Sequence, residues 1–286
     1  MIVATHKISF ITFTRNSGKR LQALLENVKD VVDEMIIIDG YSTDDTVEIA
    51  KSYGAKVFSR RPWGYVEPDR MFALKKASYD WVLYLDDDEL LGRKLKNELR
   101  ELICKASKEG FAALNTARVN YDVKYRQIIF GMAYPDRQIR IYRRDRVLYR
   151  GIVHEMPKIF GEILELPEEY FIIHYGSLST RKIVMYAYLE SFEHFTHPAR
   201  PIRRALWKLL PFSAPFLVTY RLVHDLAIRK NPYINLGTVI RTIYPNSFYE
   251  MLVHTLIRFR GKRGENISKL VSEHGLIKLL NLEDEQ

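Results

Sequence analysis

The sequence contains one cysteine and no long apolar run, and each shortage excludes a class of protein. Cys104 alone cannot form an internal disulfide framework or a zinc site built from several cysteines. No segment reaches the roughly 18 consecutive apolar residues that a conventional transmembrane helix needs. Near the start, only residues 8–11 (ISFI) lie between Lys7 and the next polar residues, too few for the core of a secretory signal. We therefore expect a cytoplasmic protein.

Four known binding or catalytic motifs are also missing. The sequence has no Gly-x-x-x-x-Gly-Lys-Ser/Thr loop for nucleotide phosphates and no glycine-rich dinucleotide fingerprint after the first expected strand. His154 and Glu155 do not begin a metalloprotease motif, because Lys158 stands where a second metal-binding histidine is needed. The turn at residues 14–18 holds only Gly18, whereas a sugar nucleotidyltransferase needs a glycine-rich, basic loop there. The sequence therefore lacks the main feature of a sugar nucleotidyltransferase, the alternative enzyme class considered for this chain.

Acidic residues are scarce in the C-terminal third. Between Ala199 and Arg263, twelve lysines and arginines accompany only two acids, Asp225 and Glu250. The net charge of the 286-residue chain is +9, so this region carries the whole excess and the remainder is close to neutral. With 47% hydrophobic and 28% charged residues, the chain is typical of one large globular domain, or of one domain with a substantial appendage. An anionic partner should therefore meet residues 199–263.

The most informative stretch is residues 81–89 (WVLYLDDDE), in which five apolar residues run into four acids. So short an apolar run is typical of a strand buried on both faces, and the acids begin where that strand should end. Ligands of open α/β sheets bind outside the carboxyl ends of the strands. Carboxylates and diphosphate oxygens are hard ligands that suit Mg²⁺ or Mn²⁺. The stretch predicts a metal-diphosphate site, and its alternative is an acidic turn that starts a helix.

Strands and helices alternate over the first half of the chain. The pattern predicts strands at residues 7–13, 34–39, 55–59 and 81–85, and helices at 20–32, 46–53, 71–78 and 90–107. Residues 60–70, with two prolines and a glycine, should form a loop. This alternation predicts a parallel α/β sheet with right-handed crossovers. Further strands are expected at 111–123, 127–132, 138–142 and 170–175, and helical periodicity from Thr180 onward places a boundary at residues 176–180.

Several of these segments together resemble a known family. They are residues 8–16 (ISFITFTRN), 32–53 (VDEMIIIDGYSTDDTVEIAKSY), 69–77 (DRMFALKKA), 80–89 (DWVLYLDDDE) and, further on, 140–144 and 151–155 (GIVHE). In this order they resemble glycosyltransferase family 2, which has the GT-A fold, and within it the branch of lipopolysaccharide-core and cell-wall enzymes. The resemblance covers about residues 7–175.

The resemblance implies a fold and a reaction. The fold is α/β, with a GT-A type, Rossmann-like nucleotide-diphospho-sugar transferase sheet over residues 1–178 and a C-terminal helical extension at 179–286. A donor half is expected at about residues 7–107 and an acceptor half at about 108–178. The implied reaction moves a sugar, with inversion and with Mg²⁺ or Mn²⁺, from a nucleotide-sugar donor, expected to be a UDP-sugar. The implied acceptor is a saccharide or a lipid-linked glycan of the cell envelope.

On the donor side the resemblance also implies roles for single residues. It implies that six residues bind the donor nucleotide: Thr12, Thr14, Asn16, Asp39, Arg70 and Asp86. Among them, Asp39 is expected to contact the base. Asp86 and Asp88 match the two acids of the Asp-x-Asp motif, with Asp86 near the ribose and the metal and Asp88 as a direct metal ligand. Asp87, between them, is expected to tolerate substitution. Two structural alternatives stay open, since Asp39 also suits a turn and Arg70 also suits the solvated start of a helix.

On the acceptor side the resemblance implies a base and further ligands. Glu155 is the expected catalytic base for the attacking hydroxyl. His154 and His174 are candidates for a metal or diphosphate contact, and Arg140 falls in the acceptor part. The alternatives are a surface glutamate at a helix start and two histidines with structural roles.

The C-terminal third permits two interpretations. Residues 209–220 (LLPFSAPFLVTY) are apolar but broken by Pro211 and Pro215, with cations and aromatics on both sides. This mixture suits peripheral binding of residues 199–263 to an anionic membrane surface on the cytoplasmic face. The alternative is a pair of helices packed on the catalytic domain. A nucleic-acid-binding protein would also be basic and aromatic here, but no binding signature occurs, so no nucleic acid partner is expected. The sequence predicts no particular oligomeric state.

Overall fold

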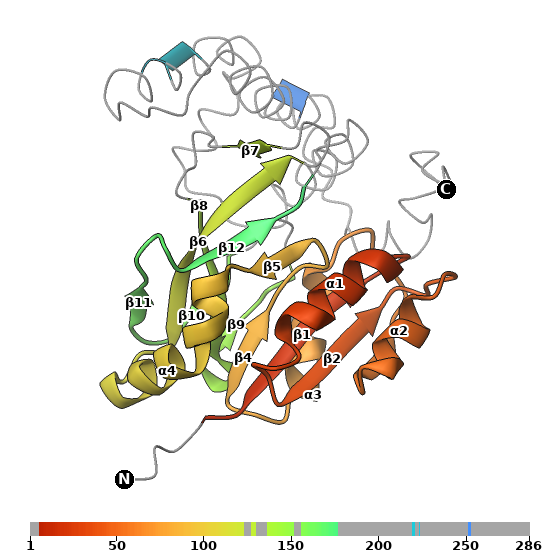
Figure 1. Cartoon of the computed structure of the whole chain (residues 1–286), viewed down its shortest axis with the longest axis horizontal. Helices are drawn as coiled ribbons and strands as arrows, with labels where there is room; N and C mark the ends of the chain where they lie inside the picture. The colour runs from red at the N-terminus through yellow and green to blue at the C-terminus, as the bar shows by residue number, and fades with distance from the viewer. Residues whose placement is uncertain are drawn as a thin grey trace, which may run out of the picture. The chain divides into compact units, whose positions relative to one another are not determined.

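The structure is a computed structural model of the chain, and it describes residues 6–122, 127–129, 136–151 and 156–176, with short pieces at 219–220, 223 and 251–252 (Figure 1). The chain forms two compact units, Met1–Ile128 with Tyr134–Gly176, and Ile129–Ala133 with Ser177–Gln286. His154 and Glu155 lie outside the described residues, as do all but the short pieces of residues 199–263.

The first half of the chain builds four parallel strands with their helices. Its elements are β1 (Ile8–Thr14), α1 (Gly18–Val28), β2 (Glu34–Asp39), α2 (Thr46–Ser52), β3 (Lys56–Ser59), η1 (Glu67–Asp69), α3 (Arg70–Lys76) and β4 (Trp81–Tyr84). Strand β1 pairs in parallel with both β2 and β4, and β2 pairs in parallel with β3, which gives the order β3-β2-β1-β4. The predicted alternation and the predicted parallel pairing are confirmed for this half (Figure 1).

The second half extends the same sheet with both antiparallel and parallel pairs. Its elements are β5 (Glu89–Leu91), α4 (Arg93–Glu109), β6 (Ala113–Asp122), β7 (Gln127–Ile129), β8 (Asp136–Arg143), η2 (Arg144–Arg146), β9 (Val147–Leu148), β10 (Lys158–Ile159), β11 (Ile163–Glu165) and β12 (Phe171–His174). Strand β8 runs antiparallel to both β4 and β6, and the sheet continues as β4-β8-β6-β12-β5. Strands β9 and β10 form a separate pair. The sheet is therefore mixed: the parallel strands predicted for the first half are joined beyond β4 by a second half whose direction the pattern did not predict.

Two local predictions are corrected. The acids do not run directly into a helix, because Glu89–Leu91 forms β5 against β12 and α4 begins only at Arg93. Gly92 marks the change: its N–H donates to the Phe171 carbonyl at 2.9 Å, and a Cβ at this position would lie 2.8 Å from the same oxygen. Within residues 60–70, which were expected to be only a loop, η1 forms and buries Glu67 and Asp69.

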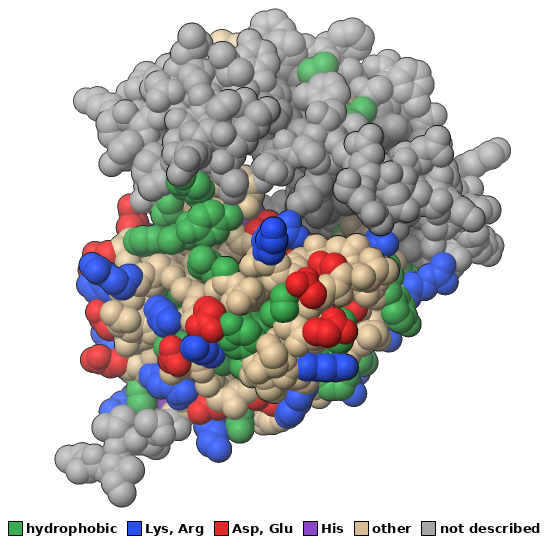
Figure 2. All heavy atoms as spheres, turned by 45° about the vertical axis from the view of Figure 1, so that its right-hand side comes forward, with side chains coloured by type: hydrophobic (Ala, Val, Ile, Leu, Met, Phe, Trp, Pro, Cys, Tyr) green, Lys and Arg blue, Asp and Glu red, His purple; other side chains and the backbone are tan. Residues whose placement is uncertain are grey.

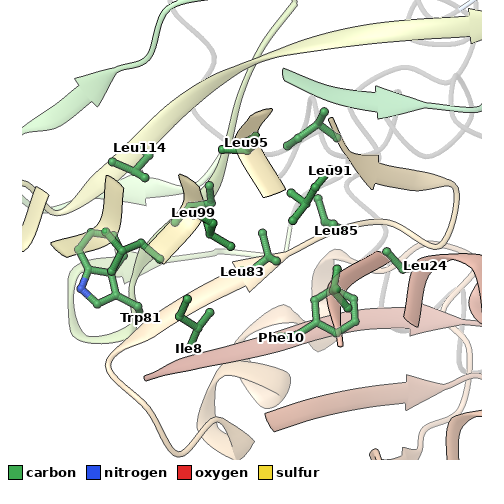
Figure 3. Packing of buried hydrophobic residues seen from close by; sticks show 14 of the residues in the cluster. Ile8, Phe10, Leu24, Trp81, Leu83, Leu85, Leu91, Leu95, Leu99 and Leu114 are labelled. Carbon is green, nitrogen blue, oxygen red and sulfur yellow. The ribbon is translucent and has the colours of Figure 1, made fainter. Parts of the chain in front are cut away.

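The core lies on both faces of the sheet and fixes the strand that precedes the acids. Trp81, Leu83 and Leu85 pack with α1 and α4 on one face (Figure 3), whereas Val82 and Tyr84 pack with α3 on the other. All five side chains are buried, as predicted for this strand. Each apolar side chain buried in this way contributes about 1.5–3 kcal/mol of transfer free energy. The loop that follows β4 therefore starts from a rigid position.

The described surface is mixed in charge. On the face shown in Figure 2, acidic and basic side chains lie interspersed with hydrophobic ones over the described unit. Within the described ranges, no helix combines the length and the apolar character that crossing a membrane requires.

Candidate functional site

The expected donor residues meet at the carboxyl ends of β1, β2 and β4. Thr14 and Asp39 are paired across β1 and β2, and the Leu85 N–H donates to the Ile11 carbonyl at 3.2 Å as β4 ends. Asp86 follows one residue later. The three loops that leave these parallel strands therefore lie at one edge of the sheet, as the strand pattern predicted.

Asp39 is held rigidly at this edge. The residue is 1% exposed, and its carboxylate accepts hydrogen bonds from Thr14 Oγ1 at 3.3 Å, from the Ser42 N–H at 2.9 Å and from Ser42 Oγ at 2.5 Å. Ser42 is a partner that the sequence did not reveal. Its two bonds fold the segment after β2 back onto Asp39 and fix the position of the carboxylate.

Asn16 joins the loops after β1 and β2. Its side-chain carbonyl accepts from the Thr43 N–H at 2.8 Å, and its own N–H donates to Ser42 Oγ at 2.9 Å. Its backbone φ of 50° lies in the left-handed region, which asparagine tolerates better than most residues. Thr12 is different, because it is fully buried inside the sheet, whereas Asn16 is exposed.

Asp86 is bound by the protein through both carboxylate oxygens. Tyr84 donates its hydroxyl to Oδ1, and Arg140 donates from Nη2 to Oδ2. Burial by itself would raise the pKa of Asp86, but the charges of Arg140 and then Arg70, with the hydrogen bond from Tyr84, outweigh it and hold the pKa well below its usual range. Asp86 is therefore a fixed negative charge at this edge.

Beneath Asp86 lies a charge network that links three strands. Glu89 is fully buried and accepts from Arg140 at 2.7 Å and from Arg118 at 3.1 Å, while its other oxygen accepts from the Asp86 N–H at 3.1 Å. Arg118 also pairs with Asp136 at 2.6 Å. The nearby carboxylates Asp86 and Glu89 raise the pKa of Arg140, although burial opposes this. The network places Arg140 against the acidic loop.

Arg70 is buried within a stack of aromatic rings. Its guanidinium carbon lies 4.9 Å from the ring centre of Tyr84 and 5.0 Å from that of Tyr149, and it pairs with Glu67 at 3.6 Å. Arg140 lies 4.7 Å from the centre of the same Tyr84 ring. Arg70 is only 8% exposed, so it acts on the site through its charge and through Tyr84.

Asp88 and His174 face each other where the loop after β4 meets the end of β12. His174 Nδ1 donates to the side-chain oxygen Oδ1 of Asn120 at 2.8 Å, and His174 Nε2 lies 3.6 Å from Asp88 Oδ2. The Tyr175 N–H donates to the Asp88 carbonyl at 2.8 Å. A Cβ on Gly176 would come within 2.4 Å of the His174 ring, so glycine there leaves room for the imidazole.

This pair suits a divalent ion that is shared with a diphosphate. Adjacent ligand atoms in the octahedral shell of Mg²⁺ lie about 3.0 Å apart, so two atoms 3.6 Å apart need only a small approach to share one ion. Among the described residues, no three histidine, cysteine, aspartate or glutamate side chains gather as a complete metal site. Mg²⁺ commonly needs only one or two carboxylates, with phosphates and water as its other ligands. The donor set of Asp88 and His174 therefore fits.

Asp87 contacts a different part of the molecule. Its carboxylate bonds to Ser17 and Arg20 at the start of α1 instead of joining Asp86 or Asp88.

Sequence reasoning missed the residues that hold the acids in place. They are Ser42, Tyr84, Glu89, Arg118 and Asn120. The only signal for Glu89 in the sequence is its place in the acidic run. A contact across strands leaves no local signal, as in the bond from Arg140 to Asp86, which joins residues 54 positions apart.

Comparison with solved structures gives matches of low similarity. The structure of TarS from S. aureus, residues 1–349 with UDP, has 18% sequence identity and a TM-score of 0.44, and the match covers 89% of this chain and 91% of that one. The mannosyltransferase PcManGT from Pyrobaculum calidifontis, with GDP-Man and Mn²⁺, has 10% identity and a TM-score of 0.48, with coverage of 90% and 87%.

Sequence comparison gives stronger relationships. An uncharacterized glycosyltransferase of Rickettsia typhi is 40% identical over 108 residues, which are 37% of this chain and 36% of that protein. Glycosyltransferase SunS of Bacillus phage SPbeta is 29% identical over 154 residues, 52% of this chain and 34% of SunS. The match thus spans only about a third of the length of these relatives. The profile described as Glycosyl transferase family 2 matches residues 9–171, more than half of the chain. The chain therefore belongs to glycosyl transferase family 2.

Proposed function

We propose that this glycosyltransferase moves a sugar from a UDP-sugar to a hydroxyl of a saccharide or lipid-linked glycan, with Mg²⁺ or Mn²⁺ and with inversion. The observation that supports this best is the meeting of three fixed acids at one edge of the sheet. Asp39 comes from β2, while Asp86 and Asp88 come from the loop after β4. Asp88 faces His174 across a distance that an ion can span.

Each acid has a distinct part in this proposal. Asp39, fixed by Thr14 and Ser42, accepts a hydrogen bond from the N–H of the base. Asp86 stays ionised beside Arg140 and faces the ribose. Asp88 and His174 would hold the divalent ion, which when bound supplies positive charge to the departing diphosphate.

Glu155 is the proposed base. The acceptor oxygen attacks the anomeric carbon while the bond to the diphosphate oxygen breaks, and the hydroxyl proton passes to Glu155. A single displacement of this kind inverts the anomeric centre. Glu155 precedes Met156 and Pro157, where the described chain resumes before β10.

Replacing Glu155 with glutamine should lower kcat for transfer by at least about a hundredfold, because a positioned base contributes 10²–10⁴-fold. The affinity for UDP should be unchanged, since Glu155 acts on the acceptor. Steady-state kinetics and calorimetric titration with UDP measure the two effects separately. An unchanged kcat would show that another group takes the proton.

A thermal-shift panel tests the donor proposal as a whole. UDP, GDP and their sugar conjugates, each with Mg²⁺, with Mn²⁺ or with EDTA, should raise the Tm only where base and metal suit the site. A UDP concentration 100 times its Kd should stabilise the fold by about 2.7 kcal/mol. No shift with any nucleotide, together with salt-sensitive binding to generic nucleic acid, would support the nucleic-acid-binding alternative instead.

A further inference from the structure

The middle acid of the Asp-Asp-Asp run is engaged as closely as its neighbours. Asp87 Oδ2 accepts from Ser17 Oγ and from Arg20 Nη2 at 2.9 Å, and the same Arg20 nitrogen donates to Ser17 Oγ at 3.1 Å. These three side chains close a triangle that we term the Asp87 clamp. Ser17 is 3% exposed, the Asp87 side chain is 19% exposed, and Arg20 covers them from solvent with a side chain that is 56% exposed.

The clamp connects the acidic loop to the other two loops of the donor edge. The Ser17 N–H donates to Thr46 Oγ1 at 2.8 Å, and the Gly18 N–H donates to Asp44 Oδ2 at 3.2 Å. Both acceptors belong to the segment that leads from β2 into α2. Ser17 is thus the point where the loop after β1, the loop after β2 and the loop after β4 are joined.

The neighbours of Asp87 are fixed from the opposite side. Asp86 is bound to Arg140 of β8, and the Asp88 carbonyl is bound to the N–H of Tyr175, just after β12. Asp87 attaches the turn itself to α1, while the Asn27 side chain of α1 holds Leu91 at the end of β5 through hydrogen bonds of 3.2 and 2.9 Å. Without it, the turn that carries Asp88 would be fastened on its acceptor side and would lose its side-chain bonds to the donor side.

We propose that Asp87 is a positioning residue that holds Asp88 at the donor edge through the clamp. The proposal rests on the proposed function, in which Asp88 binds the metal of a metal–nucleotide complex. Residues that orient a metal ligand commonly change metal affinity by 10–100-fold when they are replaced. A metal ligand on a short loop depends on such support, because a displacement of about 1 Å is enough to weaken a preorganised site.

The test measures UDP affinity by calorimetry in full-length protein, with Mn²⁺ and with EDTA. Asp87→Ala should weaken UDP binding about tenfold in Mn²⁺ and leave binding in EDTA unchanged. Asp87→Asn, which keeps an acceptor for Ser17, should recover most of the loss. Arg20→Ala should cost about threefold, because ion pairs with an exposed partner are weak. The neighbouring exposed cation gives a matched control, and Lys19→Ala should have no effect.

The double variant separates the clamp from independent effects. Arg20→Ala combined with Asp87→Ala should bind UDP and Mn²⁺ no more weakly than Asp87→Ala alone, because both changes remove the same contact. Fully additive losses, or an equal loss in EDTA, would overturn the positioning role.

A measurement without ligand keeps the clamp distinct from the proposed function. Amide hydrogen exchange at residues 86–89 should be faster in Asp87→Ala than in the unaltered chain, with the interior of α4 unchanged. Faster exchange in a protein that binds no nucleoside diphosphate would uphold the clamp and overturn the function. Unchanged exchange in a protein that binds UDP and Mn²⁺ would overturn the clamp alone.

Discussion

Replacing Asp88 with alanine should remove the Mn²⁺-dependent part of UDP binding and reduce sugar transfer by at least about a hundredfold, the scale of losing one strong electrostatic contact to a leaving group. Asp88 Oδ2 faces His174 Nε2 across 3.6 Å, and no third protein ligand completes this pair among the described residues. Without Asp88, the ion would lose the carboxylate of this pair. His174 alone would bind a hard cation poorly.

Calorimetric titration with UDP in Mn²⁺ and in EDTA measures this loss directly. The variant should bind UDP equally in both solutions, because Asp39 still recognises the base. His174→Ala should cause a smaller loss, since the carboxylate remains. Asp30→Ala provides the control, because Asp30 is an exposed acid just beyond the C-terminal end of α1, the end away from the clamp, and is paired only loosely with Lys96 at 3.9 Å. A Mn²⁺ effect that survives in Asp88→Ala would place the ion elsewhere.

The donor half could be predicted from sequence because its signals are local. Residues 81–85 are apolar throughout, as a strand covered on both faces must be, and the acids follow at once. Parallel strands joined by helices must end at the same edge, so Asp39 and Asp86 were brought together by topology alone.

The supporting network could not be predicted, because its partners are distant in sequence. The sequence presents Glu89 as the last acid of a run that could be solvated. In the structure it is fully buried and pairs with Arg118 and Arg140, which lie on two later strands. Strand β5 has only three residues, too few to show the alternation of a strand. The sequence pattern therefore predicts a helix from Leu90, whereas α4 begins at Arg93.

Asp87 shows the same limit. Comparison with the family motif marks only the outer acids, so substitution at the middle position was expected to be tolerated. The contacts to Ser17 and Arg20 connect residues 67 to 70 positions apart, and neither partner carries a sequence signal. From these contacts we propose a loss in metal-dependent binding where the motif alone predicts tolerance, and the affinity of Asp87→Ala for UDP decides between the two.

Replacing Arg140 with methionine should lower the free energy of unfolding by about 3–5 kcal/mol, the range for removing one partner of a buried ion pair. Arg140 is 6% exposed and its Nη2 serves both Asp86 and Glu89. Methionine fills much of the volume but leaves two carboxylates without this cation. Arg143→Met on the same strand is the control, because Arg143 pairs with the exposed Asp145 and such pairs contribute about 0–1 kcal/mol.

The loss should depend on pH in a direction that the pKa of Asp86 fixes. In the unaltered chain Arg140 lowers this pKa, so the pair stabilises the fold above the unfolded pKa of about 3.9 and is lost as the pH falls toward the folded value. Without Arg140, the pKa of Asp86 should rise from its low folded value, because burial is then opposed only by the charges of Arg70 and Arg118 and by the hydrogen bond from Tyr84. Urea unfolding at pH 7 and pH 3 should therefore show a smaller difference between the two proteins at pH 3. A difference that is equal at both pH values would mean that Arg140 stabilises the sheet by packing, and that the charge of Asp86 does not depend on it.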